Sequence, residues 1–180
     1  MNEHVNINGQ ADPLSGNTNR LRIIDCDVHP RIHSALEMKP FLSERSWDLW
    51  QSYGLRNRHG FAKGHPYPKS QPDNGMRRDA YPPDGTMAGS SLAFLQEQLL
   101  DAYDVEFGIM NPLSPSGQGE SNPELSAALA TATNEWQLER WARPEPRLKA
   151  SVCVPYEDPA AAVAEIRRRA GDPHFAQALL

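Results

Sequence analysis

The fold is decided by the first apolar stretch of the chain, Arg22-Ile23-Ile24-Asp25-Cys26-Asp27-Val28-His29, which stops at a proline. Its β-branched residues and the proline that follows are typical of a β-strand. Because side chains alternate along a strand, Asp25, Asp27 and His29 are expected on one face, and the apolar residues from Ile24 onward on the other. The stretch therefore predicts a strand that carries carboxylate and imidazole groups to its carboxyl end.

Beyond this strand, apolar periodicity predicts helices and strands in alternation. The predicted helices begin near Ser43, Ser91, Asn122 and Asp158, and the predicted later strands cover residues 106–111, 148–154 and 175–180. Asn122-Pro123 and Asp158-Pro159 each place a capping side chain before a proline at the first helical position. Strands that alternate with helices imply right-handed crossovers and a parallel sheet. An open doubly wound sheet and a (β/α)8 barrel both satisfy this order.

Two segments stand outside the alternation. Residues 1–20 are rich in Asn, Gly and Ser, and we expect a disordered leader there, before a domain at residues 21–180. Within the domain, residues 54–90 are rich in Pro, Gly and Arg, and we expect a long loop insertion after the first strand. Its arginines either hold a substrate carboxylate or only solvate the loop; they are Arg56, Arg58, Arg77 and Arg78.

Composition excludes several classes of partner. The net charge is −5, and no basic stripe typical of a nucleic-acid-binding protein is present. No run approaches the ~20 apolar residues that span a bilayer, and the first residues do not resemble a signal peptide. The two cysteines, Cys26 and Cys153, fall within predicted strands and are expected to be buried core residues. We therefore expect a cytoplasmic protein with a small-molecule substrate and no membrane partner, with a homo-oligomer left open.

Asp27 and His29 are the best candidates for chemistry. Two residues apart on one strand, their Cα atoms are ~6.5–7 Å apart and their side chains point the same way. Carboxylate and imidazole are both good ligands for zinc and related divalent metals. The competing interpretation is that both are ordinary polar residues at the rim of the sheet, because a metal needs one or two further ligands. Asp25, deeper on the same face, is a candidate partner that orients the pair.

The run Ile24-Asp25-Cys26-Asp27-Val28-His29-Pro30 resembles the first barrel strand of the amidohydrolase superfamily. It is most similar to the amidohydrolase-2 branch, which includes aminocarboxymuconate semialdehyde decarboxylase-like enzymes. Later segments resemble the following units of that barrel in the same order, and the resemblance covers Leu21 to Leu180 apart from residues 54–90. It implies the N-terminal half of a TIM-type (β/α)8 barrel, as four β/α units.

By this resemblance, Asp27 and His29 take the positions of the first-strand metal ligands. Aspartate in place of the family's usual first histidine leaves the metal open: zinc is favoured, with manganese or magnesium as alternatives. The family's remaining ligands and its general base lie beyond Leu180, and His174 precedes the fourth strand rather than following a later one. The implied activity is a metal-dependent hydrolase or non-oxidative decarboxylase acting on a small carbonyl or carboxylate substrate.

Two other interpretations remain beside this one. Leu179-Leu180 ends the sequence inside an apolar strand, and four strands are half of a barrel of typically ~250 residues, so we expect the N-terminal part of something longer. A non-catalytic truncated fragment that needs a partner or the missing half-barrel is therefore the alternative. A calcineurin-like phosphoesterase also begins with an Asp-x-His triplet, but Gly171-Asp172-Pro173-His174 lacks that family's second aspartate, and no Gly-Asn-His element occurs.

Overall fold

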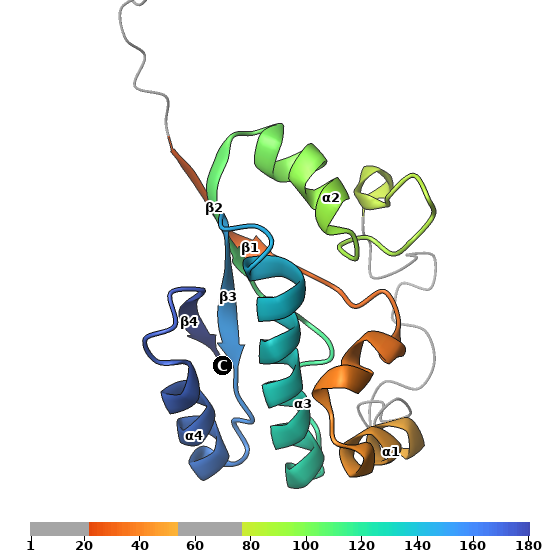
Figure 1. The fold of residues 1–180 in the computed structure, drawn as a ribbon, viewed down its shortest axis with the longest axis vertical. Coiled ribbons are helices and arrows are strands. Elements are labelled where there is room, and N and C mark those ends of the chain that lie inside the picture. Colours follow the sequence, from red (N-terminus) through yellow and green to blue (C-terminus); the bar gives the residue numbers. More distant parts are fainter. Residues whose placement is uncertain (1–21, 54–76) are drawn as a thin grey trace, which may run out of the picture.

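The computed structural model describes residues 22–53 and 77–180, in which strands and helices alternate as predicted (Figure 1). The strands are β1 (Ile23–Val28), β2 (Val105–Met110), β3 (Leu148–Cys153) and β4 (Phe175–Leu179). The α-helices are α1 (Glu44–Ser52), α2 (Leu92–Leu95), α3 (Pro123–Gln137) and α4 (Pro159–Arg169). Shorter helical segments are the 3-10 turns η1 (Ala35–Phe41) and η4 (Arg78–Ala80) and the π-helical turns η5 (Gln96–Asp101) and η6 (Leu138–Ala142). The predicted leader at residues 1–20 lies outside the described residues, as do residues 54–76 of the predicted insertion.

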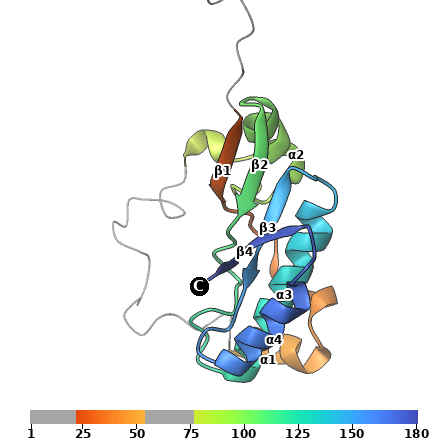
Figure 2. The same cartoon turned by 90° about the vertical axis from the view of Figure 1, so that its left-hand side faces the viewer.

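The strand order decides between the two closures that the sequence left open. The four strands pair in the order β1-β2-β3-β4, and every pair is parallel. Figure 2 shows α1, α2, α3 and α4 on one side of this sheet. A doubly wound sheet reverses its strand order and carries helices on both faces, whereas a (β/α)8 barrel keeps sequential order with its helices outside. The fold is therefore that of the TIM-type barrel, represented by four β/α units.

Local signals in the sequence start the helices. Ser91, Asn122 and Asp158 each accept a hydrogen bond from a backbone N–H group of the first turn, as expected of N-caps. Prolines occupy the first position of α3 and of α4, where no intrahelical N–H is needed. The longest α-helix, α3, has 15 residues. None of the helices in the two described ranges is long and apolar enough to cross a bilayer.

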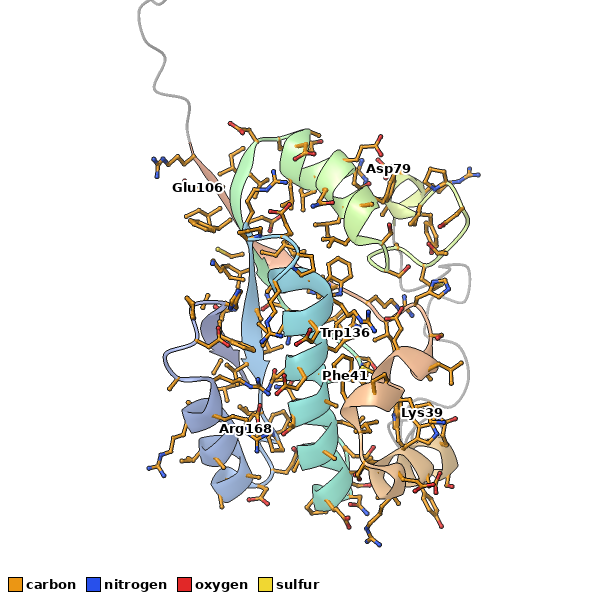
Figure 3. All side chains as sticks on the ribbon, in the orientation of Figure 1. Lys39, Phe41, Asp79, Glu106, Trp136 and Arg168 are labelled. Carbon is orange, nitrogen blue, oxygen red and sulfur yellow. The ribbon has the colours of Figure 1, made fainter. Side chains whose placement is uncertain are left out.

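The core lies between the sheet and the helices on that side, and tryptophans fill much of it. Trp50, Trp136 and Trp141 are each at most 4% exposed, and the rings of Trp136 and Trp141 meet edge to face at 5.9 Å. Trp136 lies on α3 beside the η1 segment (Figure 3), and its indole Nε1 donates to Glu37 Oε2 at 3.2 Å. Trp47 packs against Trp50 at the edge of the same cluster. The tryptophans are core residues.

The predicted burial of the first strand is only partly correct. Val28 is buried, but Ile24 is 56% exposed and Cys26 is exposed. β1 pairs only with β2 in the described sheet, and its register is irregular between Asp25 and Val28, so its residues do not alternate cleanly between faces. Cys153, by contrast, is buried as predicted, and burial raises the pKa of its thiol to about 12.

The buried face of α4 also differs from the expectation. Apolar periodicity predicts Val163, Ile166 and Ala170 as inward residues, but all three are exposed, Val163 at 44% and Ile166 at 40%. Glu165 and Arg169 take the buried positions instead, at 4% and 6% exposed, and form an ion pair with each other. Apolar periodicity cannot detect this face, because its residues are charged and become tolerable in the interior only as a hydrogen-bonded pair.

A second ion-pair cluster ties the helical layer to the start of β3. The Glu145 carboxylate accepts hydrogen bonds from the Arg147 guanidinium and from the Gln96 amide. Arg147 also pairs with Asp101 at 2.8 Å, so it connects η5 with the residues that lead into β3. These contacts lower the pKa of Glu145 from its ordinary 4.5 to about 2, and the hydrogen bonds from Arg147 have the largest effect. Glu145 is therefore a stabilising carboxylate as long as it stays ionised.

Candidate functional site

Asp27 and His29 meet at the carboxyl end of β1, as their spacing along the strand predicts. Asp27 Oδ1 lies 3.4 Å from His29 Nε2. The two side chains are 73% and 42% exposed, respectively, so a ligand can reach both. This is also the end of the strands at which (β/α)8 barrels place their active sites.

The hydrogen bonding of His29 determines which ring nitrogen is available. Its Nδ1 lies 2.7 Å from the backbone carbonyl oxygen of Asn111. Because a carbonyl oxygen only accepts, Nδ1 carries the proton and the neutral ring presents a lone pair at Nε2. Nε2 lies 3.4 Å from Asp27 Oδ1, so two electron-pair donors lie close together. A cation shared between them, a proton or a divalent metal ion, stabilises such an arrangement.

Asn111, the residue directly after β2, contacts both members of the pair. Its backbone N–H donates to Val28 O at 2.7 Å, which continues the pairing of the two strands past their ends. Its side-chain Nδ2 donates to Cys26 O at 2.9 Å and to Asp27 Oδ1 at 3.2 Å. The end of β2 therefore holds the end of β1 through main-chain and side-chain contacts together.

Asp25, predicted as a partner that orients the pair, contacts the main chain of Asp27. Its Oδ1 accepts the backbone N–H of Asp27 at 2.9 Å. It therefore holds the main chain at the irregular part of β1. The carboxylate orients Asp27 through the backbone.

The end of the predicted insertion is packed against the same site. Arg31 N donates to Gly89 O at 2.8 Å, and Pro82 and Ala88 are buried. Gly89 has φ of +78°, and a Cβ placed on it would lie 2.5 Å from the carbonyl oxygen of His29. Glycine is required here by the backbone angle and by the close approach to His29.

Gly89→Ala is expected to lower the free energy of unfolding by about 1–3 kcal/mol, because both the positive φ and the contact with His29 O oppose a Cβ. Chemical denaturation measures the change. Gly85→Ala is the matched control, since Gly85 has the same φ of +78° but open space around it. Equal losses in the two variants would show that the contact with His29 contributes nothing.

The arginines proposed as carboxylate binders are only partly described. Arg56 and Arg58 lie outside the described residues. Arg77 forms a two-armed ion pair with Asp79, two residues along the chain, which occupies its guanidinium. Arg78 is exposed at the start of η4. Nothing in the described segment directs Arg77 toward Asp27 and His29.

The residues present fit a partial metal site. Within residues 22–53 and 77–180, no three His, Cys, Asp or Glu side chains gather as a possible metal site. Asp27 and His29 together offer one carboxylate and one imidazole nitrogen, two of the ligands that a catalytic zinc site uses. The Nδ1–H group of His29 donates to the backbone carbonyl of Asn111. Proteins usually orient a metal-binding histidine through such a hydrogen bond from its other ring nitrogen.

A second Asp-x-His triplet in the chain is built differently. His174 Nδ1 lies 2.8 Å from Asp172 Oδ1, so this carboxylate accepts from the ring and from the backbone N–H of the same histidine. The aspartate here orients the histidine and does not stand beside its free nitrogen. The same residue types at the same spacing therefore form a pair of open ligands only at the end of β1.

Three site residues were missed from the sequence: Asn111, Ser151 and Gln177. Ser151 Oγ donates to Asn111 Oδ1 at 2.8 Å, and Gln177 Nε2 lies 3.1 Å from the same oxygen. Only Asn111 carries a usable signal, because it stands between a predicted strand and Pro112, at the end where active sites form. The other two lie within strands, and only the register of the sheet places them here.

Comparisons with known proteins agree with this fold. The family described as amidohydrolase, Amidohydro_2, matches residues 24–179. The solved structure of 2,6-dihydroxybenzoate decarboxylase from Rhizobium is similar, with a TM-score of 0.52 and 16% identity, over 89% of this chain and 38% of that one. The same decarboxylase complexed with 2,6-dihydroxybenzoate gives a TM-score of 0.52 and 17% identity, over 89% of this chain and 39% of that one.

The chain thus spans well under half the length of either solved neighbour. At this level of identity the likeness to the solved structures concerns the fold. No curated protein matches the sequence significantly. The family match, in contrast, extends from β1 to β4 and includes Asp27 and His29. On that match, this chain belongs to the amidohydrolase family.

Proposed function

We propose that this chain contributes the first-strand ligands, Asp27 and His29, to a divalent metal site. The site would serve a hydrolase or non-oxidative decarboxylase that acts on a small carbonyl or carboxylate substrate. The observation that carries the proposal is the arrangement of His29, whose Nδ1–H donates to Asn111 O while Nε2 lies 3.4 Å from Asp27 Oδ1. The family match supports metal dependence in general terms. Zinc is the favoured ion, with manganese or magnesium as alternatives.

The chain's own groups would hold and orient the ion. A divalent metal supplies Lewis-acid polarisation of a carbonyl or carboxylate, or a bound water of lowered pKa. His29 would offer Nε2 in a fixed ring orientation, since its Nδ1 proton is held by a backbone carbonyl. Asp27 would add a carboxylate oxygen, whose negative charge partly offsets the positive charge of the ion. The exposure of Asp27 leaves room for substrate beside it.

The neighbours suggest a substrate class. The Rhizobium enzyme is a decarboxylase of 2,6-dihydroxybenzoate, a small aromatic carboxylate. The family's own description, amidohydrolase, names a hydrolytic reaction. A divalent metal ion can assist either kind of reaction by polarising a carbonyl or carboxylate group, so we propose that group as the feature of the substrate that the site recognises.

We propose the cytoplasm as the compartment and a small molecule as the partner. The support is the pair of cysteines, Cys26 and Cys153, both of which are free thiols. Disulfides are rare where thiols are kept reduced. The net charge of −5 supports neither a nucleic acid nor an acidic membrane surface as a partner.

Metal content tests the proposal. Wild-type protein extended beyond Leu180 to include the remaining ligands of the family, loaded with Zn²⁺ and freed of excess metal, is expected to retain about one ion per chain by mass spectrometry of the metal. The double variant Asp27→Ala with His29→Ala is expected to retain far less. Asp172→Ala with His174→Ala removes the other Asp-x-His triplet and is expected to match wild type.

Two results would overturn the proposal. Retention of the ion by the Asp27 and His29 double variant would place the metal elsewhere. Absence of uptake by wild-type protein would favour the alternative, a chain without catalytic function of its own.

A further inference from the structure

A row of polar side chains crosses the sheet at the level of the candidate site. It consists of Asp27 on β1, Asn111 after β2, Ser151 on β3 and Gln177 on β4. Asn111 Oδ1 lies 2.8 Å from Ser151 Oγ and 3.1 Å from Gln177 Nε2, and Gln177 Nε2 also lies 3.1 Å from Ser151 Oγ. Asn111 is therefore the central member, with two donors on one side and Asp27 on the other.

These contacts fix the orientation of the Asn111 amide. Its oxygen faces a hydroxyl and an amide NH₂ group, both of which donate to it. Its nitrogen faces Cys26 O and Asp27 Oδ1, which only accept. Exchanging the two ends of the amide would place donor against donor at Gln177 Nε2 and acceptor against acceptor at Cys26 O and Asp27 Oδ1, which are three of the four contacts. The hydrogen-bond network therefore favours the amide orientation in which Nδ2 points toward Cys26 O and Asp27 Oδ1.

The donors of Ser151 and Gln177 are used within this network. Ser151 is fully buried, so its hydroxyl donates to Asn111 without competition from water. The Gln177 amide nitrogen serves both Asn111 and Ser151. Since these donors already have partners in the protein, their effect is to orient Asn111.

We propose that Asn111 is the positioning residue of the Asp27–His29 pair, oriented in turn by Ser151 and Gln177. Its main-chain carbonyl selects the His29 tautomer with Nε2 free, and its side-chain Nδ2 holds Asp27 Oδ1 beside that nitrogen. A single residue thus sets the geometry of both candidate ligands. The expected effect of Asn111 on metal affinity rests on the proposed function. The positioning of Asp27 and His29 by Asn111 can be tested separately, in metal-free protein.

The metal-free test concerns the rotamer of Asp27. Asp27 is 73% exposed, so without a partner its χ1 angle should average over several rotamers. Hα–Hβ scalar couplings in wild-type protein are expected to report one staggered rotamer, and those in Asn111→Ala are expected to be averaged. Equal averaging in both proteins would overturn the positioning role, whatever the metal does.

The metal test measures Zn²⁺ affinity by competition with a chromophoric chelator. Asn111→Ala is expected to weaken binding about 10–100-fold, the usual effect of losing a group that orients a ligand. Asn122→Ala removes another asparagine contact, the N-cap of α3, and is expected to leave Zn²⁺ affinity unchanged. Unchanged affinity in Asn111→Ala, with wild type binding Zn²⁺, would overturn this inference and leave the proposed function intact.

A second variant covers the case in which Asn111→Ala does not fold. Ser151→Ala combined with Gln177→Ala leaves Asn111 in place but frees its amide to turn. We expect Zn²⁺ binding about 10-fold weaker and an averaged Asp27 rotamer. Wild-type affinity and a single Asp27 rotamer in this double variant would contradict the inference. Failure of wild-type protein to bind Zn²⁺ would instead defeat the proposed function, and the rotamer measurement would then decide the role of Asn111 alone.

Discussion

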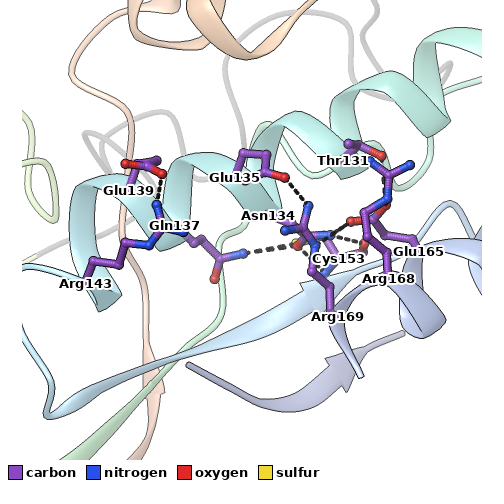
Figure 4. Close-up of polar contacts among 10 residues, drawn as sticks. All are labelled: Thr131, Asn134, Glu135, Gln137, Glu139, Arg143, Cys153, Glu165, Arg168 and Arg169. Atoms are coloured by element: carbon purple, nitrogen blue, oxygen red, sulfur yellow. Dashed lines mark hydrogen bonds and ion pairs between the residues drawn. The ribbon is translucent and has the colours of Figure 1, made fainter. Parts of the chain in front are cut away.

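Arg169→Ala is expected to lower the free energy of unfolding by about 3–5 kcal/mol, because it removes the buried cation that pairs with a buried carboxylate. The Arg169 guanidinium bonds to Glu165 Oε1 through Nε at 2.9 Å and to Glu135 Oε1 through Nη2 at 2.8 Å (Figure 4). Glu165 is 4% exposed, so water cannot replace the lost partner. The same guanidinium lies over the ring of Phe175, which extends the loss to the start of β4.

Glu165 depends on its neighbours to stay ionised. Burial opposes its negative charge, but the Asn134 amide and the Arg169 guanidinium outweigh burial and hold the pKa of the carboxyl below its ordinary value. Thr131 Oγ1 donates to the second carboxylate oxygen at 2.9 Å. Asn134 also bonds to the backbone N–H and carbonyl of Cys153, so the ion pair between α3 and α4 is tied to the end of β3.

Arg168→Ala is the matched control for Arg169→Ala. The neighbouring guanidinium lies 3.5 Å from Glu165, but its side chain is 58% exposed. An exposed pair of this kind contributes about 0–1 kcal/mol, so this variant should unfold almost like wild type. Urea denaturation of the three proteins measures the difference. Similar small losses in both variants would show that the buried pair is not a stabilising contact.

Acid is expected to destabilise the protein by about 2–3 kcal/mol through Glu145 alone, after allowance for solvent at its one-third-exposed partner Arg147. The pKa of Glu145 lies at about 2 in the folded chain, below its ordinary 4.5, chiefly because Arg147 donates to it. A depressed carboxyl pKa stabilises the fold above the unfolded value. This contribution is therefore complete above about pH 4.5 and is lost as the pH falls toward 2.

Comparison with Glu145→Gln isolates this effect. Urea denaturation at pH 6 and pH 3 should show a smaller loss of stability on acidification in Glu145→Gln than in wild type. Glu97→Gln, an exposed glutamate in η5, is the control and should lose as much as wild type. The same loss in Glu145→Gln and wild type would contradict the assigned role of the Glu145–Arg147 pair.

Much of the fold could be predicted because its signals are local. Asn122 and Asp158 act as the N-caps that their sequence context indicates, and strands and helices alternate in the predicted order. The choice between barrel and doubly wound sheet needed the strand order, which depends on contacts between residues far apart in the chain. The η1 segment was missed, since a 3-10 turn containing Pro40 carries no helical periodicity.

The candidate site could be predicted only as far as one strand reaches. Asp27 and His29 are two residues apart, so the alternation of side chains along a strand predicts that they lie on the same face. Asn111 is 82 residues from His29, and Gln177 is 66 residues from Asn111, so their meeting depends on the register of three strand pairs. The prediction of the buried face of α4 failed for a related reason. Glu165 and Arg169 can be buried only because they form an ion pair with each other.

Nitrogen NMR of His29 during addition of Zn²⁺ to metal-free protein tests whether His29 and Asp27 offer Nε2 and a carboxylate oxygen to one divalent ion. In that arrangement Nδ1 keeps its proton, which it donates to Asn111 O. We expect Zn²⁺ to shift the Nε2 resonance of His29 and the carboxyl carbon of Asp27, with Nδ1 still protonated. An unperturbed His29, or metal bound through Nδ1, would contradict it.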